Sequence, residues 1–352
     1  MAKTKEDRIK TVLGGGGHVV ILGAGASIAS TFRNPEPNGK RLPSMDNFIE
    51  LVGLTDIVES LPEKLKAKNF EQFYSNLYND NPQSYAIREI ENRVIAYFKD
   101  MKLPENEATI YDFLVLSLRP RDLIATFNWD PFLHQAFIRN GHIADTPYLA
   151  FLHGNVALGY SKMDKKCGPP GWYSEETGNY FKPTRLLYPV ARKNYTEDEF
   201  ISGEWDLIKS WLHEESTKCV TVFGYSAPDS DVEAVSLMNV AWGSADKRNM
   251  EQFEIIEIRP EKEGKKRWNN FIHSHHYNYT SDYFSSSLAN NPRRTFESYR
   301  QHNLPLTIDE IFSESNPISP DIKTLQELWD WHMPLVNAEN EWKEKQKLKD
   351  DA

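Results

Sequence analysis

The sequence predicts an α/β protein: a Rossmann-like, doubly wound parallel sheet with a helical insertion and a C-terminal helical extension. Short apolar runs without polar alternation recur along the chain, as expected of strands that helices cover on both faces. Each run ends in glycine, serine, asparagine, aspartate or histidine. In an open parallel sheet the carboxyl ends of the strands line the ligand crevice, so these residues are candidates for a binding site.

The first strand is predicted at His18–Leu22 and leads directly into the loop Gly23–Ser27. Gly23 and Gly25 lack a Cβ atom, so a tight turn can form and the backbone can approach a ligand closely. Nucleotide-binding domains present backbone N–H groups to phosphates in this way. The dinucleotide fingerprint is incomplete, because Ile28 stands where its third glycine belongs. The loop therefore disfavours a hydride-transfer dehydrogenase and favours another nucleotide-using protein.

Residues 45–103 are predicted to form a helical insertion that covers the cofactor site. Met45–Leu54 and Tyr85–Lys99 are its clearest helical segments. An apolar stripe at helical spacing marks the second of them, made of Ile87, Ile90, Val94, Ile95 and Phe98.

Three later segments repeat the pattern of an apolar strand followed by polar residues or glycine. Their ends are Asn128 and Asp130 after residues 122–126, His153 and Gly154 after 148–152, and Gly224 and Ser226 after 218–223. In a parallel sheet these ends meet at one edge. Four such ends together indicate a ligand site more strongly than any one of them.

The rest of the chain gives weaker patterns. Residues 158–185 are rich in Gly, Pro and Tyr and are expected to form a long loop or small lobe. A helix is predicted at 203–214, a strand at Glu254–Arg259, and irregular structure at 273–305. The last thirty residues are predicted to form an amphipathic helix, with apolar positions at Leu325, Leu328, Trp329, Trp331 and Leu335.

These elements divide the chain into three parts. Residues 1–14 are expected to be an N-terminal extension, 15–265 the Rossmann-like domain with its insertion, and 266–352 an irregular and helical C-terminal extension.

Four motifs occur in an order that resembles the sirtuin superfamily, specifically its bacterial sirtuin-like NAD-hydrolysing branch. Gly23–Ser27 resembles the family's G-A-G-x-S phosphate loop, and Thr126–Asp130 resembles its T-x-N-x-D motif. His153-Gly154 matches the H-G of the family's catalytic histidine, and Gly224–Ser226 resembles its G-x-S loop. The resemblance covers roughly residues 15–260.

The resemblance implies that Asp130 hydrogen-bonds the nicotinamide carboxamide and that Asn128 orients the attacking water. It also implies that His153 binds the ribose hydroxyls and acts as general base, a role that a pKa near 6.5 suits at neutral pH. The implied cofactor-binding residues, from the pyrophosphate to the adenosine side, are Gly23, Ala24, Gly25, Ser27, Thr126, Gly224, Ser226 and Glu257.

Each of these side chains also has a purely structural explanation. His153 can be a satisfied structural histidine. Asn128 and Asp130 can cap the helix that begins near Pro131, since aspartate before proline is a favourable helix start. Ser27 can cap the helix that follows the phosphate loop.

The chain departs from the family at two places. Protein-deacetylating sirtuins carry a zinc module with two Cys-x-x-Cys pairs, whereas this chain has 2 cysteines, Cys167 and Cys219, so a four-cysteine zinc site is impossible. The family's Gly-Ile-Pro-Asp-Phe-Arg loop is replaced by residues 27–33, where Arg33 is either a phosphate contact or a solvated arginine. The cluster His273–His276 lacks the spacing of a known metal site, so a surface loop is favoured there.

The implied activity is cleavage of the nicotinamide–ribose bond, with NAD as substrate, no zinc, and linear or cyclic ADP-ribose as product. Two alternatives are an NAD-dependent protein deacylase and a non-catalytic NAD or ADP-ribose sensor that regulates a partner. NADases of this kind resemble effectors of bacterial antiphage (abortive infection) systems. The resemblance therefore implies a homo-oligomer and an activating partner protein, either an ATPase/helicase or an Argonaute-like protein.

Composition excludes several other classes. A net charge of -10 and a pI near 5.6 argue against direct nucleic-acid binding by this chain. The mean hydropathy is -0.60, and no apolar run approaches the length of a membrane span. The N-terminus shows no secretory signal and cysteines are few, so a cytoplasmic location is expected.

Overall fold

The computed structural model describes residues 17–35, 39–190, 193–215, 217–248, 250–273, 276–303 and 316–350. The predicted N-terminal extension, residues 1–14, lies outside them. Six strands form the main sheet in the order β3-β2-β1-β7-β8-β9, and every neighbouring pair is parallel. Their bounds are β1 Gly17–Leu22, β2 Leu123–Thr126, β3 Tyr148–Phe151, β7 Thr217–Phe223, β8 Gln252–Ile256 and β9 Tyr277–Thr280.

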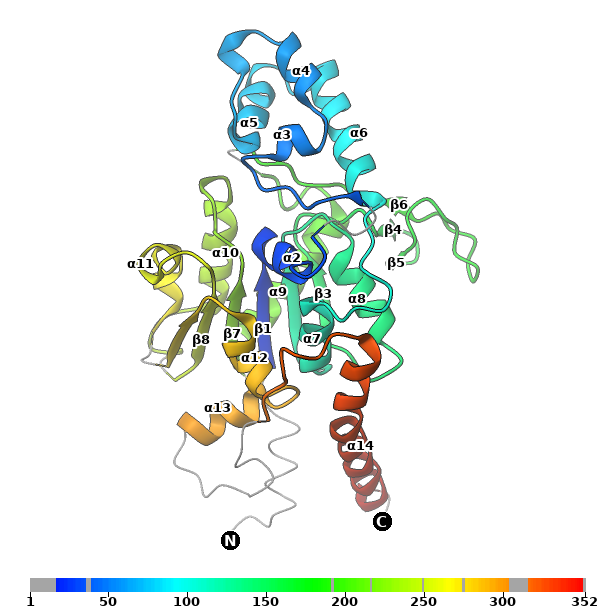
Figure 1. Ribbon diagram of the computed structural model, residues 1–352, viewed down its shortest axis with the longest axis vertical. Helices are drawn as coiled ribbons and strands as arrows, with labels where there is room; N and C mark the ends of the chain where they lie inside the picture. The colour runs from blue at the N-terminus through cyan, green and yellow to red at the C-terminus, as the bar shows by residue number, and fades with distance from the viewer. Residues whose placement is uncertain are drawn as a thin grey trace.

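This strand order confirms the predicted doubly wound fold. Numbered along the chain, the sheet runs 3-2-1-4-5-6, which is the dinucleotide-binding order, and its direction reverses between β1 and β7. The apolar run of β1 is fully buried, with Val19 to Leu22 at 0% exposure, because the strand lies at the centre of the sheet and helices flank it (Figure 1). The flanking helices include α7 (Ile110–Ser117), α9 (Glu199–His213) and α10 (Val232–Trp242).

The helical insertion is present and lies beyond the carboxyl ends of the strands (Figure 1). It consists of α3 Phe48–Leu51, α4 Thr55–Ser60, η2 Glu63–Leu65, α5 Phe70–Asp80 and α6 Tyr85–Lys99. The bounds of α6 match the prediction. Four residues of its predicted stripe are buried, but Ile95 is 41% exposed. The single helix expected at Met45–Leu54 is wrong, because α3 starts late and ends before Gly53, which has a φ of 76°.

The segment between β3 and α9 forms the small lobe that its composition suggested. It holds a three-stranded sheet, β4 Gly159–Ser161, β5 Lys166–Gly168 and β6 Lys182–Pro183, in the order β5-β4-β6. Helix α9 begins four residues earlier than predicted because Asp198 caps it, accepting a hydrogen bond from the backbone N–H of Ile201 at 3.1 Å.

The far edge of the sheet differs from the prediction. Strand β8 ends at Ile256 rather than Arg259, and the segment expected to be irregular contains β9, which pairs with β8. The sheet therefore continues past residue 265. Four half-buried residues, Tyr-Asn-Tyr-Thr, make up β9, so this edge strand has no apolar run to reveal it. Short helices complete this region: η3 Asp229–Asp231, α11 Glu261–Gly264, η4 Lys266–Phe271, η5 Tyr283–Ser285, α12 Ser287–Asn290 and α13 Thr295–Asn303.

The predicted C-terminal helix is α14, Leu325–Asp350. It packs on its own chain through Leu325, Leu328 and Val336, which are buried. Trp329 is half-buried and donates its indole N–H to Asn140 Oδ1 at 2.8 Å. No helix in the described part of the chain is long and apolar enough to cross a membrane.

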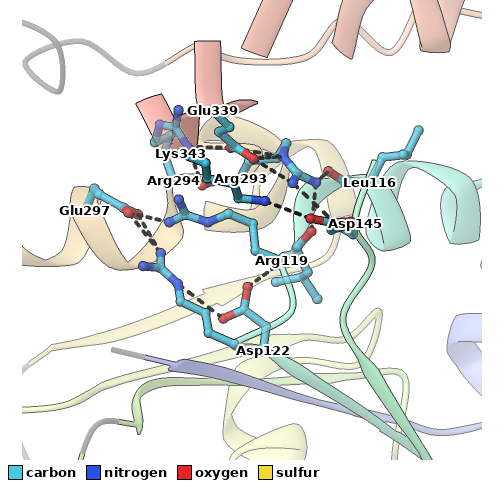
Figure 2. Close-up of polar contacts among 11 residues, drawn as sticks. Leu116, Arg119, Asp122, Asp145, Arg293, Arg294, Glu297, Glu339 and Lys343 are labelled. Atoms are coloured by element: carbon cyan, nitrogen blue, oxygen red, sulfur yellow. Dashed lines mark hydrogen bonds and ion pairs between the residues drawn. The ribbon is translucent and has the colours of Figure 1, made fainter. Parts of the chain in front are cut away.

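A buried ionic cluster ties this C-terminal region to the amino ends of the strands (Figure 2). Arg293 donates from Nη2 to Glu339 of α14 at 2.7 Å and from Nη1 to the carbonyl of Leu118 at 3.0 Å. Glu297 of α13 pairs with both Arg119 and Arg121, which lie just before β2. Charged pairs of this kind fix the two helices to the sheet and are costly to leave half-made.

Candidate functional site

Two glycine loops meet at the point where the strand order reverses. The N–H of Gly23 donates to the carbonyl of Phe223 at 3.1 Å, and the N–H of Gly25 donates to the carbonyl of Gly224 at 2.9 Å. Gly224 has a φ of 61°, and a Cβ on it would lie 2.3 Å from the nitrogen of Ala26. These glycines are therefore required for the packing of one loop on the other, whatever further role they have toward a ligand.

A cavity of about 710 Å³ opens beside these loops. Among its lining residues are three of the predicted cofactor-binding positions, Gly25, Gly224 and Glu257. Ala24 lies next to them, exposed, at the start of α2 (Ala24–Ser30). A cavity of this volume is within the range typical of small-molecule sites.

Ser226 is not brought to that cavity. It is exposed and lines a second cavity of about 750 Å³, together with Arg259, Lys266 and Arg267. Glu257 accepts a hydrogen bond from the Arg259 guanidinium at 2.8 Å, which links the walls of the two cavities.

A second group of predicted residues forms one buried polar network. The Asn128 amide nitrogen donates to the carbonyl of Gly23 at 2.8 Å, to Ser27 Oγ at 2.9 Å and to Tyr111 OH at 3.2 Å. Ser27 Oγ and Tyr111 OH are 2.6 Å apart. Burial raises the pKa of Asp130 to about 6, although hydrogen bonds from Ser27 and from the Phe132 N–H oppose the rise. The structure thus joins the phosphate loop to the end of β2.

The loop after β2 is held by its own backbone and by one residue that the sequence did not indicate. Thr126 is buried, and its Oγ1 accepts a hydrogen bond from the N–H of Asn128 at 3.1 Å, which closes a local turn. Asp130 Oδ1 accepts from the N–H of Phe132 at 3.2 Å, at the start of α8 (Phe132–Asn140). Asn155 donates its amide N–H groups to the carbonyls of Asn128 at 3.2 Å and Asp130 at 2.7 Å.

His153 lies at the end of β3 and is 5% exposed. Its Nε2 atom is buried and has no hydrogen-bond partner. Burial lowers its pKa to about 4, with the charge of Asp231 raising it and that of Lys193 lowering it. The imidazole is therefore neutral at pH 7 and retains a lone pair that can accept a proton.

His153 contacts the ring of Phe127, the residue that precedes Asn128. Phe127 packs edge-on against the imidazole at 4.8 Å and stacks on Tyr225 at 4.1 Å. Within the described residues, no hydrogen bond or ion pair joins His153 to Asn128 or Asp130. The predicted catalytic residues therefore lie at neighbouring strand ends, but in two distinct polar groups.

The group around His153 contains residues that the sequence did not single out. Asp231 Oδ1 lies 3.8 Å from His153 Nε2 and accepts a hydrogen bond from the Lys193 ammonium. Asp231 Oδ2 accepts from Tyr225 OH at 2.8 Å. Asp231 follows the Gly-x-Ser loop closely enough to have been noticed as a polar residue after a strand. Lys193 sits in a loop without any motif, so only tertiary structure brings it here.

Arg33 and the two cysteines can also be placed. Arg33 lines the cavity beside the glycine loops, but it donates to the carbonyls of Ile322 at 2.8 Å and Pro320 at 2.5 Å, so it holds the chain before α14. Cys167 is exposed and Cys219 is buried in β7. In the described ranges no three His, Cys, Asp or Glu side chains are grouped to hold a metal ion. Of the cluster 273–276, residues 274 and 275 lie outside those ranges.

The chain was compared with known proteins. No protein-family model and no curated protein matches it. Solved structures similar to it include a Sir2 homologue in complex with ADP-ribose, at 12% identity and a TM-score of 0.39, covering 87% of this chain and 100% of that chain. A Sir2 homologue–NAD complex is similar at 13% identity and a TM-score of 0.37, covering 86% and 96%. At such values the likeness carries no conclusion about activity.

Proposed function

We propose that this protein is an NAD+ glycohydrolase that cleaves the nicotinamide–ribose bond to give nicotinamide and ADP-ribose. The observation that carries the proposal is the convergence of four sirtuin-like motifs at the carboxyl edge of one sheet. The motifs follow β1, β2, β3 and β7, which are adjacent in the sheet. In sheets of this strand order, dinucleotides bind across the crevice where the order reverses.

Cleavage of this bond requires the protein mainly to position the dinucleotide and the attacking water. Nicotinamide leaves as a neutral molecule while the ribose C1 develops oxocarbenium character, so a strong nucleophile is unnecessary. The site must hold the dinucleotide, stabilise positive charge at C1 and deliver water. A buried carboxyl beside a glycine loop and a neutral histidine suit these tasks.

We propose distinct roles for three residues. Asn128 uses its amide nitrogen within the protein, so its amide oxygen is the group that orients the attacking water. Asp130 is the partner of the nicotinamide carboxamide. His153 accepts the proton from water as the new C1–O bond forms and the C1–N bond breaks, with the electron pair leaving on nicotinamide.

For the cofactor contacts, we propose that Gly23, Ala24, Gly25 and Ser27 hold the pyrophosphate. Thr126 supports them through its turn with Asn128. Gly224 and Glu257 belong to the adenosine side, because both line the cavity beside the glycine loops. Ser226, on the other cavity, takes part only if the bound dinucleotide extends around the Gly224 turn.

The test is incubation of NAD with the full chain, alone and with its cognate partner, followed by chromatography of the products. The proposal expects nicotinamide and ADP-ribose to form without any acyl-lysine peptide. Intact NAD in every assembly state contradicts the enzyme. Turnover that requires an acetylated peptide establishes the deacylase instead, and NAD binding with dispensable Asn128 and His153 establishes a sensor.

We further propose that the enzyme is the NAD-depleting effector of an antiphage system, and that it works as a homo-oligomer triggered by a partner. An enzyme that hydrolyses NAD continuously would exhaust its cell, so an off state is needed. Exposed apolar side chains on the insertion and α14 supply contact surface, such as Tyr85 at 75% and Met333 at 37% exposure. Light scattering of the wild type and of Met333→Glu tests this, and a monomer at tens of micromolar, with and without partner, contradicts it.

A further inference from the structure

We propose that Asp231 is a positioning residue for His153: held by Lys193 and Tyr225, its carboxylate fixes the imidazole as the Nε2–H tautomer and leaves Nδ1 as the base. This inference rests on the proposed NAD hydrolysis for its kinetic test, but its structural part stands on the contacts alone. Nothing in the four motifs assigns a role to Asp231 or Lys193.

The first step is the orientation of the Asp231 carboxylate. One oxygen accepts a hydrogen bond from the Lys193 ammonium, and the other accepts from Tyr225 OH at 2.8 Å. Lys193 is itself fixed, since it also donates to the carbonyl of Ser230 at 2.9 Å. Asp231 and Lys193 are both buried, at 4% and 7% exposure. The carboxylate therefore has little freedom to turn away from the imidazole.

The second step is the protonation state of Asp231. Burial alone would raise its pKa, but the charge of His153 once that ring is protonated, the Lys193 ammonium and the two hydrogen bonds outweigh burial, and the pKa lies below its usual value. Asp231 is thus ionised at neutral pH, and an ionised carboxylate can only accept hydrogen bonds.

The third step follows from the atom that faces this carboxylate. His153 Nε2 lies 3.8 Å from Asp231 Oδ1, is buried and has no hydrogen-bond partner. In a neutral imidazole one nitrogen carries the proton and the other is a lone pair. A lone pair turned toward a buried carboxylate would be repelled, so Nε2 carries the proton. Catalytic hydrogen bonds are often long before substrate binds and shorten in the complex.

The consequence concerns the proton that the reaction releases. When Nδ1 accepts a proton from the attacking water, the imidazole becomes a cation with Asp231 beside it. The aromatic groups that the described residues place around the ring are uncharged: Phe127 lies edge-on, Tyr195 is stacked at 6.2 Å, and Tyr225 stacks on Phe127. Burial raises the pKa of both tyrosines, so neither carries charge at neutral pH. Asp231 stabilises the imidazolium, and Lys193 limits this effect by neutralising part of its charge.

The test compares Asp231→Asn, Lys193→Met and Tyr225→Phe in the full chain. Histidine-labelled protein gives the tautomer and pKa of His153 by NMR, assigned with a His153→Gln variant. We expect the Nε2–H tautomer in the wild type. We expect the His153 pKa to fall below that of the wild type in Asp231→Asn and to rise above it in Lys193→Met. A merely structural role does not produce opposite shifts.

Kinetics supply the second readout. Loss of an orienting carboxylate should lower kcat by between roughly 10-fold and 10⁴-fold, while KM for NAD stays within a few-fold of the wild-type value. The matched control is Asp112→Asn, which also removes a buried carboxylate paired with a cation, Arg139, but lies outside the His153 group. It should leave the tautomer, the His153 pKa and kcat unchanged.

Several results overturn the proposal. One is an Nδ1–H tautomer in the wild type, and another is an unchanged His153 pKa in both charge variants. A rise in KM with constant kcat shows instead that Asp231 binds substrate directly. If Asp231→Asn does not fold, Tyr225→Phe removes one hydrogen bond that orients the carboxylate and must lower kcat, while Lys193→Met must still raise the His153 pKa. If the wild type does not cleave NAD, the proposed function fails, yet the tautomer and the titrations still decide the pairing.

Discussion

Two buried histidines, at opposite ends of the same sheet, are treated differently by their surroundings. At the amino ends, His18 Nδ1 lies 3.1 Å from Thr295 Oγ1 and Nε2 lies 2.8 Å from Thr221 Oγ1. At the carboxyl ends, His153 keeps a buried Nε2 without a partner, 3.8 Å from Asp231. Burial lowers both pKa values, to about 3 and about 4. Both ring nitrogens of His18 have partners, whereas Nε2 of His153 has none within the described residues.

The comparison indicates that the amino ends of the strands serve stability and that the carboxyl ends form the candidate site. The amino edge holds the ionic cluster of Arg293 and Glu339 that anchors α14, and its role is structural. The carboxyl edge combines a neutral histidine, a carboxyl with a raised pKa and a cavity beside glycine loops. A buried nitrogen without a partner lowers stability, so its occurrence beside a cavity and a carboxyl of raised pKa favours a functional role for the carboxyl edge.

The largest expected effect comes from replacing each of the two histidines with alanine. His153→Ala should lower NAD turnover by roughly 10²-fold to 10⁴-fold, the usual loss when a positioned base is removed, and leave NAD binding nearly unchanged. His18→Ala should instead destabilise the fold by removing the ring's buried hydrogen bonds to Thr295 and Thr221, with normal turnover per folded molecule. Product chromatography measures the loss of turnover, and thermal shift with excess NAD measures stability and NAD binding in both variants. Wild-type turnover in His153→Ala would contradict the assignment of His153 to the active site.

The next effect tests the amino edge. Arg293→Met should lower the free energy of unfolding by about 3 kcal/mol, because the buried Glu339 carboxylate loses every hydrogen bond from Arg293 and, among the described residues, keeps only the one from Arg294 at 2.7 Å. The control is Lys343→Met, which breaks an exposed ion pair with Asp145 and should cost about 0–1 kcal/mol. Urea titrations measure both. Equal losses in the two variants would show that the cluster is no stronger than a surface pair.

A pH effect follows from the lowered pKa of His153. The native state holds the ring neutral down to about pH 4, whereas the unfolded chain takes up a proton near pH 6.5. The contribution of this residue is therefore complete above pH 6.5 and lost as pH falls toward 4. Relative to His153→Gln, the wild type should lose up to about 3 kcal/mol over this window, at about 1.4 kcal/mol per pKa unit. Urea unfolding at pH 7, 5.5 and 4.5 gives the difference, and a constant difference contradicts the lowered pKa.

The smallest effect concerns the glycine loops. Gly224→Ala forces a side chain into a left-handed conformation and against the nitrogen of Ala26, so it should cost about 2–3 kcal/mol and weaken NAD binding. Gly53→Ala has a similar φ of 76° but no atom within 4 Å of its Cβ, and should cost about 1 kcal/mol with normal binding. Equal losses of stability in the two variants would contradict the argument that the loops at Gly23–Gly25 and Gly224 must pack closely.

The sequence predicted the sheet where burial left a clear pattern. Strands β1, β2, β3 and β7 are apolar because helices cover them, and their polar ends could be read from the chain. Strand β9 was missed because it is half-buried and polar at the edge. Ile95 shows the opposite error, since an apolar residue beside a helical stripe can still face solvent.

The candidate site was only partly predictable for a related reason. Asn128, Asp130 and His153 follow strands, so local sequence placed them at one edge. Their division into two polar groups follows from their different side-chain neighbours, Ser27 for Asn128 and Asp231 for His153, which no motif reports. Lys193 and Asp231 meet across 38 positions of sequence, and their pairing arises only when the loop before α9 folds over the end of β7.

The most direct test of the contrast between the two edges is hydrogen–deuterium exchange of the full chain with and without saturating ADP-ribose, the proposed product, which avoids turnover. The account predicts slower exchange in peptides covering residues 23–30, 126–130, 152–156 and 224–231, and no change at 117–122 or 293–297. Protection at the amino edge, or no protection anywhere at saturation, would contradict it.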